Sequence, residues 1–259
     1  MTDRLGYRLK LGVVIPSTNT IVQPETDAMR PHGVTNHIGR IHIPDLPLTN
    51  DAEFEQIISA IEPDLFGAID RVMSCKPAHL IMAMSIPTFW GGIAGAASLR
   101  ARLEARSGVT VSLGSSACVE ALRNFPELCT IGILTPYQPV GDAHVARFFE
   151  ESGWRVGAVH SLKRPSEVLI GHATEADLRD GLKILAAKGV DAIVQAGTDL
   201  AMADLCGEAE RWLGIPIIAI NSQPTGRRCE PMAFTTACAG SACCCPSIEG
   251  AHEAVHMPR

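Results

Sequence analysis

Neutral hydrogen-bonding side chains follow four apolar runs of this sequence, at 8–15, 80–84, 130–134 and 191–195. They are Ser17, Thr18, Asn19, Ser85, Thr88, Thr135, Tyr137 and Thr198, and the carboxyl of Asp199 follows the last of them. Hydroxyl, amide and backbone N–H groups of this kind hold carboxylates. A single Ser, Thr or Asp in such a place is better explained as a helix cap. Several such loops meeting in one place favour a ligand site, and the sequence therefore indicates a pocket for a small carboxylate.

The apolar runs that precede these residues predict the strands that must position them. Runs of this length, bounded by Gly and Pro, are typical of buried parallel strands. Expected strands are 8–15, 37–43, 80–84, 109–113, 130–134, 154–160, 191–195 and 215–220. Expected helices are 51–74, 94–106, 117–124, 142–152, 173–188 and 202–213, and the rest of 21–50 is expected to be irregular. In open α/β sheets, ligands bind beyond the carboxyl ends of the strands.

The two halves of the sequence match each other in the same order. LGVVIPS at 11–17 aligns with IGILTPY at 131–137, HLIMAMSIPT aligns with AIVQAGTDLA, and GVTVSLGSS aligns with GIPIIAINS. A duplicated strand–loop–helix unit predicts an α/β fold of two pseudo-symmetric lobes, each a parallel sheet flanked by helices. We expect an active site between the lobes. The first lobe would span 1–115, completed by 221–259, and the second 116–220.

Composition limits the classes of function. The chain has 259 residues, 46% apolar and 19% charged, with a net charge of −6. An acidic chain without a basic patch is not expected to bind nucleic acid. No apolar run reaches the roughly 18 residues of a membrane span, and the start resembles no signal peptide. We expect a cytoplasmic protein with reduced thiols and no membrane partner, and the sequence leaves open whether it forms a homo-oligomer.

Motifs for phosphate, zinc or nucleophilic serine chemistry are missing from the sequence. It has no G-x-G-x-x-G, no G-x-x-x-x-G-K, no H-E-x-x-H and no nucleophile elbow. We therefore expect no metal and no cofactor. His79 precedes a strand at the end away from the loops, and His144 is expected at the surface. Cys118 and Cys206 fall inside helices and are expected to be buried thiols.

The sequence changes character at Gln223. The last stretch holds five of the nine cysteines and has no hydrophobic periodicity. Its candidate metal ligands are Cys243, Cys244, Cys245, His252 and His256. Their spacing fits no zinc pattern, because zinc sites use paired ligands that are separated along the chain.

A shifted reading frame explains the tail better than a metal site does. Read from the third base of each codon, Met232-Ala233 forces a glycine codon and Cys243-Cys244-Cys245 forces two leucine codons. The remaining codons permit Ala-Thr-Tyr-Trp-Ala-Ala-Leu-Arg and a further amphipathic stretch. We therefore hypothesise that the ending after about Gln223 is frameshifted, which sequencing of the gene would test.

Two loops carry a likeness to known enzymes. PSTNT at 16–20 and TPY at 135–137 resemble substrate-binding loops of the Asp/Glu racemase superfamily, in particular of maleate isomerase and arylmalonate decarboxylase. The resemblance covers about 8–222, and the shifted reading of the tail is also similar to the ending of these enzymes. It implies that Asn19 and Tyr137 bind substrate, in a cofactor-independent enzyme.

Two further loops resemble those that carry the catalytic cysteines of these enzymes, and here they depart from the pattern. MSIPTFWGG at 84–92 has Met84 at the first cysteine position, and AGTDL at 196–200 has Gly197 at the second. Neither residue can transfer a proton or add to an alkene as a thiolate. A carboxylate pocket that stabilises an enediolate remains, with a proton from Tyr137, Asp199 or water.

Three functions are consistent with these residues. The first is a lyase that decarboxylates a small carboxylic or dicarboxylic acid, as arylmalonate decarboxylase does. The substrate would contact Ser17, Asn19, Met84, Ser85, Thr88, Thr135, Tyr137, Gly197 and Thr198, with Phe89 and Trp90 as apolar walls. The second is an isomerase similar to maleate isomerase or to a racemase. The third is a carboxylate-binding relative without catalysis.

Overall fold

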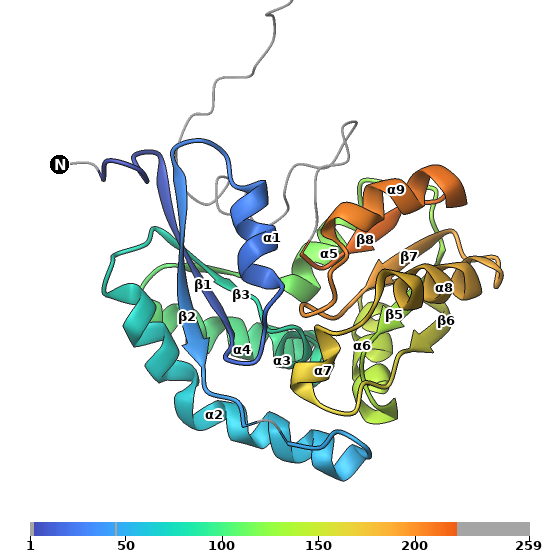
Figure 1. Cartoon of the computed structure of the whole chain (residues 1–259), viewed down its shortest axis with the longest axis horizontal. Coiled ribbons are helices and arrows are strands. Elements are labelled where there is room, and N and C mark those ends of the chain that lie inside the picture. The colour runs from blue at the N-terminus through green and yellow to red at the C-terminus, as the bar shows by residue number, and fades with distance from the viewer. Residues whose placement is uncertain (1–2, 45, 222–259) are drawn as a thin grey trace, which may run out of the picture.

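The computed structural model describes residues 3–44 and 46–221. Within these residues the chain forms two four-stranded parallel sheets with helices around them (Figure 1). The strand order is β2-β1-β3-β4 in the first sheet and β6-β5-β7-β8 in the second. This confirms the predicted α/β fold class, and the two sheets share one strand order, as the matching sequence halves predict.

The first sheet and its helices come from the first half of the chain. In order, its elements are β1 (Leu9–Pro16), α1 (Val22–Met29), β2 (Val34–Ile41), α2 (Asp51–Met73), β3 (His79–Met82), α3 (Ser85–Phe89), α4 (Gly92–Ser107) and β4 (Thr110–Leu113). The connecting helix α5 (Gly114–Leu122) contains the predicted boundary at 115. The second half continues with β5 (Thr130–Thr135), α6 (Pro139–Glu151), β6 (Arg155–Ser161), α7 (Glu167–Ile170), α8 (Glu175–Ala186), β7 (Ala192–Gln195), α9 (Ala203–Leu213) and β8 (Ile217–Ala219).

Side chains alternate between the two faces of the first sheet. Val14, Leu80 and Met82 belong to a core that includes residues of α2, α4 and α6. Val13 and Ile81 belong to a separate core on the α1 side. The first of these cores also contains residues of β5 and β7, so apolar packing joins the two sheets.

Three short helices were not predicted. The expectation of irregular structure over 21–50 is wrong for Val22–Met29, because Pro24 lies in the first turn of α1, where a missing N–H does no harm. Helices α3 and α7 are only five and four residues long, too short for periodicity to be seen. Strand β3 ends at Met82 and β2 begins at Val34, each a few residues earlier than expected.

The break between α3 and α4 depends on two consecutive glycines. Gly91 and Gly92 have φ of 76° and 68°, in the left-handed region that residues with a Cβ avoid. The turn therefore needs glycine at both positions.

No helix among residues 3–44 and 46–221 is long and apolar enough to cross a membrane. The tail cysteines, the tail histidines and the hypothesised frameshift all lie outside the described residues.

Candidate functional site

A small cavity lies where loops from both sheets meet, beyond the carboxyl ends of β1, β3, β5 and β7. Its volume is about 20 Å³, enough for about one water molecule. The cavity is lined by Pro16, Thr18, Asn19, Met84, Ser85, Ile86, Pro136, Tyr137, Glu167, Ile170, Gly197, Thr198 and Asp199. Seven of these are among the residues predicted to contact or act on the substrate: Asn19, Met84, Ser85, Tyr137, Gly197, Thr198 and Asp199. Thr18, also among the polar loop residues that the sequence singles out, lines the cavity too.

Ser85 connects the two lobes at this cavity. Its Oγ lies 2.5 Å from the Tyr137 hydroxyl and accepts a hydrogen bond from the Thr198 backbone N–H at 3.2 Å. The Thr198 hydroxyl is 3.5 Å away. All three side chains are buried, so these contacts form in a site from which water is largely excluded.

The hydroxyl protons of this cluster have a definite direction. The Tyr137 hydroxyl donates to the Ala196 carbonyl at 3.0 Å, since a carbonyl can only accept. Ser85 must then donate its own proton to the Tyr137 oxygen. Burial raises the pKa of Tyr137 well above its ordinary range. In this arrangement neither proton points into the cavity.

Asn19 presents a hydrogen-bond donor that has no partner. Its Oδ1 accepts the backbone N–H groups of Ile21 at 3.1 Å and Val22 at 2.9 Å, which identifies this atom as the oxygen. The residue is 1% exposed, and its Nδ2 has no hydrogen-bond partner. A buried unpaired donor is rare in folded proteins, and it points to an acceptor supplied by a ligand or a water molecule.

Asp199 places a carboxyl group beside the same cavity. Burial raises its pKa to about 7, and the neighbouring Glu25 acts in the same direction. Backbone N–H groups of Thr20, Ile21 and Gly171 oppose this by stabilising the anion. The carboxyl therefore changes charge near neutral pH.

Glu167 is a site residue that the sequence analysis missed. It is 8% exposed, lines the cavity from α7, and its charge adds to the effect of burial in raising the pKa of Tyr137. Ser166 caps α7 by accepting the Leu169 N–H at 3.3 Å. The pair Ser166-Glu167 is a helix-start pattern that could have indicated this element.

Four predicted contact residues do not line the cavity. The Ser17 hydroxyl accepts the Ile43 N–H at 2.9 Å, and the Thr135 hydroxyl donates to Asp142. The Thr88 hydroxyl donates to the Ser85 carbonyl at 2.6 Å. Phe89 is fully buried against Phe148 and Phe149, so it belongs to the core.

The other predicted apolar wall, Trp90, also lies elsewhere. Its ring stacks on His144 with 3.8 Å between ring centroids. His144 is therefore partly buried, although the sequence predicts a surface residue. Apolar contact to the cavity comes instead from Met84, Ile86 and Ile170.

Gly197 has no room for a side chain. A Cβ built on it would lie 2.6 Å from Cδ of Pro136, a rigid ring that cannot rotate away. The four cysteines of the described residues, Cys75, Cys118, Cys129 and Cys206, all lie outside the cavity lining. Within the same residues no group of three or more His, Cys, Asp or Glu could hold a metal ion.

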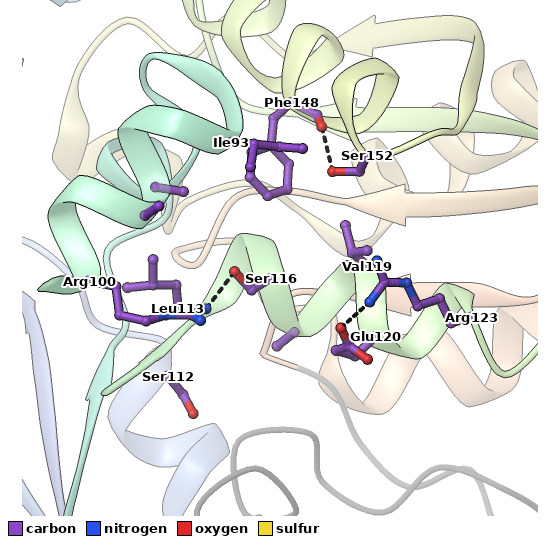
Figure 2. A pocket seen from close by; sticks show the side chains of 13 residues that line it. Ile93, Arg100, Ser112, Leu113, Ser116, Val119, Glu120, Arg123, Phe148 and Ser152 are labelled. Carbon is purple, nitrogen blue, oxygen red and sulfur yellow. Dashed lines mark hydrogen bonds and ion pairs between the residues drawn. The ribbon is translucent and has the colours of Figure 1, made fainter. Parts of the chain in front are cut away.

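A larger cavity of about 620 Å³ lies between α4, α5 and α6 (Figure 2). Figure 2 shows Arg100 bonded to Ser116 on one side and Arg123 paired with Glu120 on the other. Ile93, Leu113 and Phe148 supply apolar walls. None of the residues predicted for the site lines this cavity.

The arylmalonate decarboxylase family model matches residues 11–228, and the chain therefore belongs to this family. The predicted resemblance to arylmalonate decarboxylase and maleate isomerase is confirmed at this level. The match ends five residues beyond Gln223, where the sequence changes character. No curated protein sequence matches the chain.

Solved structures of maleate isomerases and of arylmalonate decarboxylase share the fold. A maleate cis-trans isomerase of Nocardia farcinica bound to TRIS is 19% identical with a TM-score of 0.73, over 82% of this chain and 87% of that one. The maleate isomerase Iso from Pseudomonas putida is 16% identical, with a TM-score of 0.73 over 82% and 88%. A structure of arylmalonate decarboxylase is 17% identical, with a TM-score of 0.65 over 89% and 92%. At these identities the likeness establishes the fold.

Proposed function

We propose that the cavity between the two sheets binds a small carboxylate. The observation that carries this proposal is the buried Nδ2 of Asn19, a donor without an acceptor, beside the hydroxyls of Ser85, Tyr137 and Thr198. Among residues 3–44 and 46–221, no Lys, Arg or His lines the cavity, so the anion would be held by neutral N–H and O–H groups. A maleate isomerase from Pseudomonas putida, of the same fold, has been solved with maleate.

The reaction we propose is decarboxylation through an enediolate, without a cofactor. The donors that hold one carboxylate would stabilise the negative charge that develops on it when the second leaves as carbon dioxide. Met84, Ile86 and Ile170 would form an apolar surface beside the leaving group, which disfavours its charged form. A proton then reaches the carbon from water, because the Tyr137 hydroxyl donates to the Ala196 carbonyl and Asp199 accepts backbone N–H groups.

Substrate entry requires the cavity to enlarge. A carboxylic acid of several heavy atoms exceeds about 20 Å³. The segment around α7 lines the cavity and contacts the opposite lobe at its edge, where Leu48 N–H donates to the Pro165 carbonyl at 2.7 Å. We propose that this bond breaks and that movement of the segment admits the substrate.

A non-catalytic carboxylate-binding protein is the second candidate. One maleate isomerase structure contains a covalently bound succinylcysteine intermediate. Here none of the described cysteines lines the cavity, and Gly197 leaves no room for one. Isomerisation or racemisation by thiol chemistry is therefore less well supported than decarboxylation or binding alone.

The test uses phenylmalonate and maleate as probes, with calorimetry for binding and assays for carbon dioxide and fumarate. The N19D variant keeps the oxygen that accepts from Ile21 and Val22, but replaces the free donor with a second acceptor. We expect carboxylate affinity to fall at least about 100-fold, or about 3 kcal/mol, because like charges would meet in a buried site. The exposed Asn124 provides the matched control, N124D.

Carbon dioxide from phenylmalonate would support the decarboxylase. Binding without turnover would support the second candidate, and fumarate from maleate would favour an isomerase. Failure of both probes to bind, or N19D binding as tightly as the unaltered protein, would contradict the proposal.

A further inference from the structure

The start of α1 is held by side chains from both lobes. Three consecutive backbone N–H groups precede or begin this helix. Asp199, which follows β7 of the second sheet, accepts the first of them, from Thr20, at 3.0 Å. Asn19 accepts the next two, from Ile21 and Val22. Asp199 therefore ties the turn that carries Asn19 to the opposite lobe, and further along α1 Glu25 makes a second link by accepting the Ala203 N–H at 2.9 Å.

Asp199 is enclosed between the start of α1 and the end of α7. A Cβ on Gly171, just after α7, would lie 3.0 Å from Oγ1 of Thr20 and 3.2 Å from Oδ2 of Asp199. Both carboxyl oxygens therefore face backbone from neighbouring segments, and Asp199 is 7% exposed. A proton donor to a substrate would need an oxygen directed into the cavity instead.

We infer that Asp199 is a positioning residue, which fixes the turn at Asn19 so that Nδ2 meets the bound carboxylate. This inference rests on the proposed function. The Asn19 amide cannot rotate without losing two N–H bonds, so its Nδ2 moves only with the turn as a whole. Asp199 sets the place of that turn relative to the lobe that contributes Tyr137 and Thr198. The substrate carboxylate is thus bound by residues of both lobes, whose relative position Asp199 fixes.

The test separates positioning from proton transfer by two substitutions. The D199N variant retains an oxygen that can accept from Thr20 but cannot act as a carboxylic acid, whereas D199A loses the acceptor. We expect D199N to keep kcat and the Kd for phenylmalonate within about threefold, and D199A to weaken that Kd about 10- to 30-fold. Because Asp199 acts through Asn19, D199A should add less than about twofold in an N19D background.

Three results would overturn the inference. The first is a large loss of kcat in D199N with unchanged Kd, which would identify Asp199 as a proton donor. The second is no effect of D199A on Kd. The third is that the effects of N19D and D199A add in the double variant. Amide hydrogen exchange at Thr20, Ile21 and Val22 provides a readout without ligand. Exchange at these amides should accelerate in D199A and not in D199N. This measurement needs no ligand, so it tests the positioning role even if the wild-type protein binds neither probe and the proposed function is refuted.

Discussion

Two cavities of this protein, one between the helices α4, α5 and α6 and one between the sheets, differ in volume and in hydrogen bonding. The cavity between α4, α5 and α6 has a volume of about 620 Å³, against about 20 Å³ for the one between the sheets. In the large cavity Arg123 is already paired with Glu120 on an exposed helix face. In the small one Ser85, Tyr137 and Thr198 bond to one another across two lobes, around an amide donor with no partner. Converging buried donors therefore indicate a ligand site better than volume does.

The small cavity lies next to carboxyl groups that are removed from water. Asp199 is buried and Glu25 is partly buried, and burial raises the pKa of both carboxyl groups. Keeping Asp199 ionised at neutral pH therefore opposes folding, while the ionised form accepts N–H bonds better. Of the charged residues that line the large cavity in the described part of the chain, Arg100 is partly buried and Glu120 and Arg123 are exposed.

The largest effect that we predict concerns Asp199 and the pH dependence of the unfolding free energy. The pKa of Asp199 is about 7 in the folded protein against an ordinary value of 3.8, so the folded state binds an extra proton between these two pH values. Its contribution to the unfolding free energy is therefore favourable at low pH and is lost as pH rises toward about 7. The D199N variant should gain roughly 2–3 kcal/mol relative to wild type between about pH 5 and about pH 8.

Urea unfolding at the two pH values measures this difference. Glu25 and the other titrating groups are present in both proteins, so most of their contributions cancel. Parallel stability profiles for wild type and D199N would show that the carboxylate is not buried as described.

A smaller loss is expected for Y137F. This variant removes the hydroxyl that links Ser85 to the Ala196 carbonyl and leaves the ring in place. We expect about tenfold weaker phenylmalonate binding, or about 1.4 kcal/mol, because the two hydrogen bonds of this hydroxyl and the orientation of Ser85 are lost. The Tyr7 hydroxyl bonds His32 at the surface, so Y7F is the matched control, and equal effects of the two would argue against a role for the cluster.

The smallest effect should come from the large cavity. Arg100 donates to Ser116, and its Nε has no hydrogen-bond partner, so it offers the strongest competing anion site. The R100M variant should bind phenylmalonate within about twofold of wild type, since methionine retains most of the aliphatic stem. If R100M weakened phenylmalonate binding by more than about tenfold, the carboxylate would bind in the large cavity and not in the one between the sheets.

The sequence predicted the sheets and the edge at which the cavity lies. Apolar runs at 8–15, 80–84, 130–134 and 191–195 correspond to β1, β3, β5 and β7, and each is followed by residues that line the cavity. Parallel strands bring their carboxyl ends to one edge, so this could be inferred without coordinates. The hypothesis of a shifted frame after Gln223 stays a prediction from the sequence alone.

The sequence could not assign partners to individual hydroxyls. Ser17 and Thr135 have the same residue types and places as cavity residues, yet they bond to Ile43 and Asp142. Glu167 and Ile170 enter the cavity from a four-residue helix that has no periodicity. The hydrophobic pattern predicts which segments are buried. It does not predict which distant group forms a hydrogen bond with each polar atom.

By itself, the amino-acid order thus determined the strands, their duplication and the family to which the chain belongs. Only the tertiary structure decided that Asn19 keeps a free donor, that Asp199 bonds the turn beside it, and that Gly197 has no space for a thiol. The physical reason is that burial of apolar runs is encoded locally, whereas a hydrogen bond between Thr20 and Asp199 joins segments 179 residues apart.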